Sequence, residues 1–383
     1  MPVPNRARAD GCESGSRADK FVRLWRRERH ARLAEVVVSR VFVHGVGAVS
    51  PAGWGVPALR AALEKNLPLP TSPLARPGWD KLIFVRAVPP PSARPEFLAH
   101  PRLRRASAAA QHVVAAALEA LGPDAKRVQR GELRLGVIVC IMAGCVTYSR
   151  RFYEEVLKNP PTASPLIFPE TVFNAPASHL AAFLNSGGIN YTLVGDDGAY
   201  LQGLALAAQW LALGQADACV VVGAEELDWI VADAVRHFHR ATVHAAGAGA
   251  VYLRREVASE NHPELAVVTD SFLFTKKQDR AAAARKMREQ LSPADGGALF
   301  LSARNIPRLD AAEVAAWADW PGPRTAPAAV LGEAFNASAA WQCVAACDAL
   351  WSGQFAAANV SVVGANQQAI GARFVATRPP ERS

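Results

Sequence analysis

The chain has 383 residues and a net charge of +8; 50% of its residues are apolar and 20% are charged. This composition can bury a large core and excludes an intrinsically disordered chain. Residues 1–40 hold ten Lys or Arg against five Asp or Glu, so the rest of the chain is nearly neutral. A basic arm can contact nucleic acid, a membrane or an acidic protein, but a solvated extension explains it more simply, and we expect no nucleic-acid partner.

The cysteines indicate a reducing compartment. No two of them form a CxxC pair, which argues against a disulfide framework and a zinc site. They are Cys12, Cys140, Cys145, Cys219, Cys343 and Cys347. The N-terminus lacks the apolar run of a signal peptide, and no segment has the roughly 20 apolar residues of a membrane helix. We therefore expect a cytoplasmic protein without a membrane span.

Apolar patterning predicts that strands alternate with helices after an N-terminal arm of residues 1–35. Strands are expected at residues 36–43, 135–141, 219–224, 247–253, 265–274, 297–302, 360–365 and 372–376. Helices are expected at residues 56–63, 105–121, 174–183, 198–213, 276–290, 311–320 and 334–351. Residues 44–51 have the composition of a turn, and 66–103 and 158–177 that of irregular, proline-rich segments. Many strands are apolar without alternation, which predicts sheets covered on both faces in a layered α/β fold.

One sequence unit occurs twice. Its first copy reads LVGDDG at 193–198, continues as an apolar run to LGQ at 213–215, and ends in CVVVGA at 219–224. Its second copy reads LGEA at 331–334, continues to SGQ at 352–354, and ends in VSVVGA at 360–365. The repeat predicts internal two-fold symmetry. It also places an acidic residue where each of two equivalent helices begins.

Four further motifs follow one another in a recognisable order. They are VHGVGAVSP at 43–51, SPLIFP to NAPASH within 164–179, GQAD to GAE within 214–225, and GAGA at 247–250. Their order and spacing resemble those of the β-ketoacyl-acyl-carrier-protein synthases. The resemblance covers residues 40–378 and implies a thiolase-like, five-layered α-β-α-β-α fold. Its two pseudo-two-fold-related halves would be residues 36–256 and 262–380.

The chemistry of that family uses a cysteine at a helix N-terminus, two histidines and a lysine. By the resemblance, Asp197 stands at the cysteine position and Ala328 at the lysine position. Arg304 and Glu333 stand at the two histidine positions. A carboxylate is a poor nucleophile toward a thioester, so we predict no decarboxylative condensation by this chain alone. We also expect neither a cofactor nor a metal ion.

The acidic residues of the repeat have two interpretations. Asp196, Asp197 and Glu333 can cap helices, which needs no chemistry. Alternatively, the pseudo-two-fold brings Asp197, Glu333 and Arg304 into one cleft, where the carboxylates act as an acid–base pair. In a third version of the same cluster, Arg304 simply neutralises the acids. His237 and His239 fit the polar face of a helix or loop better than a metal site.

The resemblance implies a non-condensing ketosynthase-like subunit of the chain-length-factor type. Such a subunit pairs with an active ketosynthase in fatty-acid-like or polyketide-like biosynthesis, and the pair works with an acyl carrier protein. One alternative is a repurposed enzyme of the hydratase, dehydratase or hydrolase type, which acts on an acyl-carrier thioester through Asp197 and Glu333. Another alternative is a non-catalytic homodimeric scaffold.

Overall fold

The computed structural model describes residues 40–256, 262–276, 279–291, 297–365 and 367–377. The chain divides into two units, residues 1–39 and residues 40–383, and everything described here belongs to the second. The expected arm at 1–35 and the first residues of the strand expected at 36–43 lie outside the described residues. Within the described part, no helix is long and apolar enough to cross a membrane.

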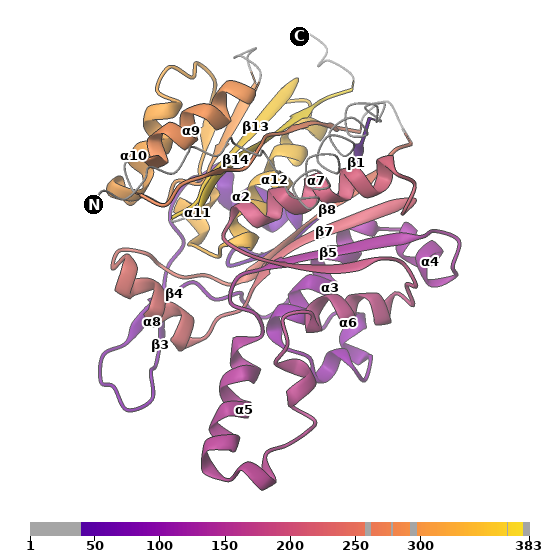
Figure 1. Cartoon of the computed structure of the whole chain (residues 1–383), viewed down its shortest axis with the longest axis vertical. Coiled ribbons are helices and arrows are strands. Elements are labelled where there is room, and N and C mark those ends of the chain that lie inside the picture. The colour runs from indigo at the N-terminus through magenta and orange to yellow at the C-terminus, as the bar shows by residue number, and fades with distance from the viewer. Residues whose placement is uncertain (1–39, 257–261, 277–278, 292–296, 366, 378–383) are drawn as a thin grey trace, which may run out of the picture. The chain divides into compact units, whose positions relative to one another are not determined.

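A large mixed sheet is the centre of the described fold (Figure 1). Its strands are β1 (Phe42–Ser50), β2 (Gly53–Trp54), β5 (Leu135–Ile141), β6 (Asn190–Val194), β7 (Ala218–Glu225), β8 (Gly247–Arg254), β9 (Glu264–Val268), β10 (Phe272–Leu273), β11 (Ala298–Leu301), β12 (Arg324–Thr325), β13 (Ala357–Val363) and β14 (Gln368–Val375). A separate hairpin pairs β3 (Ser72–Leu74) with β4 (Ile83–Val85).

The order of the strands repeats on either side of one junction. The sheet runs β12-β11-β13-β14-β9-β1-β8-β7-β5-β6, and β9 meets β1 at the pair Phe42 and Glu264. Outward from that junction, each side has two antiparallel pairings followed by two parallel ones. The division into halves at 36–256 and 262–380 stays a proposal, and this repeated order supports it.

Helices cover both faces of each side of the sheet. They are α2 (Val56–Lys65), α3 (Ala108–Leu121), α4 (Asp124–Gln129), α5 (Val146–Lys158), α6 (Ala175–Phe183), α7 (Gly198–Ala212), α8 (Trp229–Phe238), α9 (Asp279–Gln290), α10 (Pro307–Ala316), α11 (Pro327–Leu331) and α12 (Asn336–Trp351). Short 3-10 turns occur at η1 (Glu96–Ala99), η2 (Leu103–Arg105), η3 (Pro160–Thr162) and η4 (Phe168–Glu170).

The strand β7 shows how the layers arise. Its side chains alternate between two apolar clusters, with Val220 and Val222 facing α3 and α6, and Cys219 and Val221 facing α7 and α12. This is the two-residue period of a strand buried on both faces. A third cluster lies between the other side of the sheet and α9 and α10. The result is five layers, α-β-α-β-α, with α7 and α12 in the middle (Figure 1).

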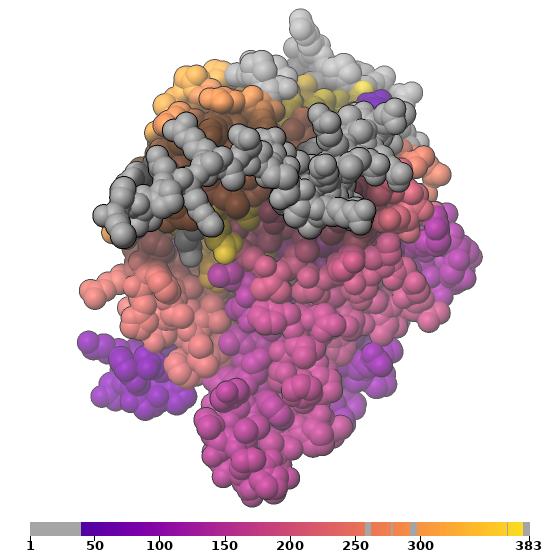
Figure 2. All heavy atoms as spheres, viewed as in Figure 1, coloured from indigo at the N-terminus to yellow at the C-terminus, as the bar shows by residue number. Residues whose placement is uncertain are grey.

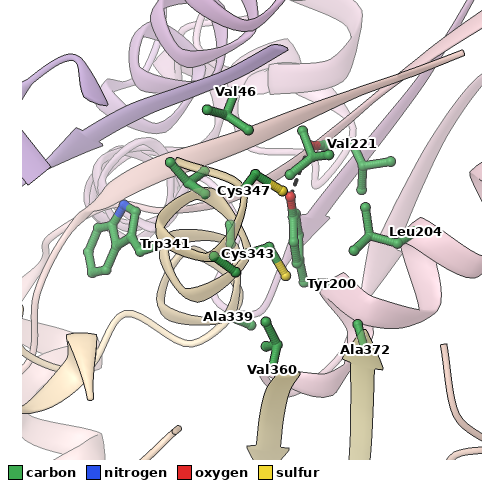
Figure 3. Close-up of a cluster of buried hydrophobic side chains, with 14 of the residues drawn as sticks. Val46, Tyr200, Leu204, Val221, Ala339, Trp341, Cys343, Cys347, Val360 and Ala372 are labelled. Carbon is green, nitrogen blue, oxygen red and sulfur yellow. Dashed lines mark hydrogen bonds between the residues drawn. The ribbon is translucent and has the colours of Figure 1, made fainter. Parts of the chain in front are cut away.

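The middle layer is tightly filled. Tyr200 of α7 is fully buried beside Cys343 and Cys347 of α12, and its hydroxyl donates to the carbonyl of Val221 at 3.4 Å (Figure 3). The two cysteines act as small apolar residues, as their spacing of one turn predicts. Trp341 donates from its indole nitrogen to the carbonyl of Ala248 at 3.0 Å, so its polar atom is satisfied within the core.

The expected turn at 44–51 is wrong for residues 44–50, which are the middle and end of β1, and only Pro51 lies in the turn that follows. Gly45 and Gly47 are present for close packing and not for a turn. A Cβ atom on either would lie 2.0 Å from a backbone oxygen of α3, at Ala120 and Ala116 respectively. The strand can therefore approach the helix only without side chains at those two positions.

Candidate functional site

Three of the residues singled out from the sequence meet in one buried cluster. Asp197 immediately precedes α7, Arg304 follows β11, and Glu333 lies between α11 and α12. The Arg304 guanidinium forms an ion pair with Asp197 through Nη2 and with Glu333 through Nε. The exposed fractions of the three side chains are only 5–6%. One cation thus joins carboxylates whose positions in the sequence are more than 130 residues apart.

Backbone contacts fix the loops that carry this cluster. Asp310 of α10 accepts from the Arg304 N–H at 3.1 Å and from the Ile306 N–H at 2.8 Å. Between them, Asn305 has a left-handed φ of 61°. Glu333 accepts from the N–H of Phe335 at 2.7 Å, which holds Phe335 at a φ of 44°. Left-handed φ values are costly for non-glycine residues, so these contacts must hold the loops in place.

Neither acid acts as the helix cap that the sequence allowed. Asp197 occupies the N-cap position of α7, yet its side chain makes no capping hydrogen bond. Glu333 precedes the N-cap residue of α12, which is Phe335. The residue that does cap α7 is Asp196, whose Oδ1 accepts from the Gly198 N–H at 3.2 Å. The side chains of Asp197 and Glu333 instead bind Arg304.

Asp196 is a second buried acid beside the cluster. Its Oδ1 also accepts from Nε2 of Gln368 at 2.7 Å, while its Oδ2 has no hydrogen-bond partner and lies against Gly364. Burial, and next the nearby charge of Asp197, raises the pKa of Asp196 to about 6. Sequence patterns gave no sign of this contact, because its two residues are 172 positions apart.

Two further groups near the cluster were not singled out from the sequence. Glu225, at the end of β7, is 0% exposed. Burial raises its pKa to about 8, although the hydrogen bonds from the backbone N–H groups of Met142 and Ala143 lower the pKa in part. His244 is 2% exposed, and its ring lies 5.7 Å from that of Phe335. Burial lowers the pKa of His244 to about 4, which keeps the imidazole neutral at physiological pH.

Other histidines and a cysteine lie in ordinary structural settings. His179 of α6 is within 2.9 Å of Glu170, and His237 near the end of α8 is 3.7 Å from Asp233. Cys145 is buried, and burial raises its pKa to about 12. A thiol with so high a pKa carries almost no thiolate at neutral pH.

The cluster has no side chain suited to attack a thioester. Asp197 is where a nucleophile would be placed by the resemblance, and its carboxylate is bound to a guanidinium that keeps its proton in proteins. The same guanidinium occupies one carboxylate oxygen of Glu333. Ala328, at the expected lysine position, is buried in α11. Arg304 therefore neutralises the carboxylates of Asp197 and Glu333 and fixes their positions.

Comparison with known proteins identifies the fold. Residues 97–257 match the beta-ketoacyl synthase, N-terminal domain, family. The structure of the ishigamide ketosynthase/chain length factor superimposes with a TM-score of 0.70 at 20% identity, covering 88% of this chain and 99% of that one. The fold is that of a ketosynthase. The thiolase-like architecture expected from the sequence is therefore confirmed.

Other solved structures with the ketosynthase fold agree. A beta-ketoacyl synthase from Burkholderia phymatum covers 89% of this chain and 100% of its own, with a TM-score of 0.70 at 16% identity. The same values hold for a ketosynthase bound to a hexaketide in complex with its type II polyketide acyl-carrier protein. At these identities the likeness concerns the fold. No curated protein matches the chain in sequence.

Proposed function

We propose that this ketosynthase-fold chain is a non-condensing subunit that pairs with an active ketosynthase. The observation that carries the proposal is the buried Asp197–Arg304–Glu333 cluster, which stands where the resemblance puts the family's cysteine and histidines. A condensing enzyme needs a thiolate to take the acyl group and donors to stabilise the enolate. Here three charged groups bind one another at those positions, so the chemistry must come from another subunit.

An exposed apolar strip supports a protein partner. The strip consists of Tyr153, Leu157, Leu166, Phe168, Phe173 and Val194, each at least 43% exposed. It runs from the outermost strand β6, where Val194 pairs with Ile141, past Gly144, which packs against Phe173. It continues onto η4 and α5, where the rings of Phe152 and Phe168 lie 5.5 Å apart. An apolar strip beside an unpaired strand edge is typical of a subunit interface.

A basic hollow between the β3–β4 hairpin and α8 suits an acidic partner such as a carrier protein. This hollow of about 370 Å³ is lined by Arg76, Lys81, Arg236, His237 and Arg240, together with Trp79, Ile83 and one acid. That acid, Asp233, is bound to Arg76 at 2.6 Å, which leaves the hollow cationic. Complementary charge of this kind speeds association and selects partners.

The acid–base alternative has weaker support. Asp197 and Glu333 could act on an acyl-carrier thioester only if one of them released Arg304, which would leave a buried charge unpaired. The homodimeric scaffold makes the same use of the apolar strip, so only the composition of the assembly separates it from the proposed subunit.

The decisive experiment is co-expression with a Cys-bearing ketosynthase, followed by native mass spectrometry. We expect a 1:1 complex, and a complex weakened at least tenfold by Leu157→Glu, which puts a charge into the strip. Asp197→Asn should leave the condensing activity of the complex unchanged. A homodimer that turns over acyl thioesters by itself, and loses that activity in Asp197→Asn, would overturn the proposal in favour of the acid–base enzyme.

A further inference from the structure

Two helices that carry the candidate partner surfaces have almost no core of their own. Every residue of α5 keeps some solvent exposure, and Figure 1 shows this helix extending away from the sheet. In the space-filling view, the magenta segment that contains α5 projects at the lower end of the described residues (Figure 2). In α8, Ala232 is the one buried residue. Apolar burial, which normally fixes a helix in place, is therefore slight for both.

Polar contacts from one short acidic run hold the start of α5. Glu225 accepts from the N–H groups of Met142 and Ala143, in the turn that leads to α5. Glu226 is 1% exposed, and its Oε1 accepts from the Thr147 N–H in the first turn of α5 at 2.6 Å. These N–H groups have no partners within a helix, so the buried carboxyl oxygens satisfy donors that would otherwise be left unpaired.

Asp228 connects the two helices. It is 4% exposed, and its Oδ1 accepts from the Ile230 N–H at 2.9 Å, which caps α8. Its Oδ2 is 3.0 Å from Nε of Arg150, a residue of α5. One carboxylate thus holds the first turn of one helix and a side chain of the other. A buried carboxylate beside a helix N-terminus is also favoured by the helix dipole.

We propose that Glu225, Glu226 and Asp228 form an acidic junction that positions α5 and α8 together from the carboxyl end of β7. The junction sets the orientation of the apolar strip on α5 relative to the basic hollow on α8. The claim that these helices face partners rests on the proposed function. Their common attachment to β7 is independent of that function. Because the acidic junction couples the positions of the two surfaces, a substitution at Asp228 must loosen both α5 and α8.

Hydrogen exchange in the purified full chain tests this attachment without any partner. We expect Asp228→Ala to accelerate amide exchange at least tenfold in the first turns of both α5 and α8, while β5 and β7 stay protected. Asp228→Asn keeps Oδ1 for Ile230 but loses the charged contact with Arg150, so it should accelerate exchange in α5 more than in α8. The matched control is Asp217→Asn, at the other end of β7, which removes an exposed ion pair with Arg134.

Two results would overturn the acidic junction. In one, Asp228→Ala loosens α8 while exchange in α5 stays at the wild-type rate. In the other, Asp217→Asn loosens α5 as much as Asp228→Ala does. If Asp228→Ala fails to fold, Glu226→Gln tests the same attachment at the Thr147 amide. A chain that shows the expected exchange but binds no ketosynthase would sink the proposed function and leave the acidic junction standing.

Discussion

Replacing Arg304 with glutamine removes the one cation that the two buried carboxylates share. Asp197 then loses the guanidinium that its carboxylate binds, while Glu333 keeps the N–H of Phe335. Breaking a buried ion pair by removing one partner costs about 3–5 kcal/mol, because an uncompensated charge stays buried. We therefore expect Arg304→Gln to lower the free energy of unfolding by about 3–5 kcal/mol at pH 7, and the melting temperature by roughly 5–15 °C.

Chemical denaturation followed by circular dichroism measures this loss, and the chain offers a matched control. Arg60 also binds a carboxylate, that of Asp348, but its side chain is 47% exposed. For Arg60→Gln we expect a loss of less than about 1 kcal/mol, since exposed pairs contribute little. The triple variant Asp197→Asn, Arg304→Gln, Glu333→Gln leaves no charge in the cluster and should recover most of the stability. The reasoning fails if Arg304→Gln costs no more than Arg60→Gln, or if the triple variant is as unstable as the single one.

Three further predictions test the interior. The pKa of Asp196 is raised from 3.8 to about 6, so the folded state binds that proton more tightly and this group adds stability as the pH falls through 6. Asp196→Asn should therefore stabilise the chain at pH 7, by up to about 3 kcal/mol, and give little or no gain near pH 4, as unfolding curves at the two pH values will show. Cys145 and Cys219, whose pKa values burial raises to about 12, should react with a thiol reagent only after denaturation, and fast labelling in the native protein would contradict their burial. Gly47→Ala should lower the melting temperature sharply, since its Cβ would lie 2.0 Å from a backbone oxygen, whereas Gly187→Ala, with nothing within 4 Å, should change it little.

The fold was predictable from the sequence because its main signal is repeated. The motif at 193–224 and its copy at 331–365 each predict a helix followed by a strand, and these became α7 with β7 and α12 with β13. Local signals failed where tertiary packing decides the structure. Gly45 and Gly47 have the composition of a turn. They are needed, however, because β1 packs closely against α3, a helix more than 60 residues further along the chain.

The candidate site was predictable only where the repeat and the resemblance to ketosynthases reached it. Matching positions placed Asp197, Glu333 and Arg304 together, and the ion pairs agree with that placement. Nothing local in the sequence pairs Gln368 with Asp196, since the contact depends on how the last strand crosses the start of α7. The same holds for α5, whose start is fixed by an acid that comes after β7.

The shared arginine also limits how such a chain can change over generations. Changing Asp197 alone to the family's cysteine leaves Arg304 and Glu333 in place, with neither histidine restored. Changing Arg304 first leaves two acids buried without their cation, and changing Glu333 first leaves the guanidinium with one partner fewer. Every single step toward a condensing enzyme therefore loses stability before it gains any chemistry. The three residues therefore resist single substitutions, because each substitution leaves at least one buried charge with fewer partners.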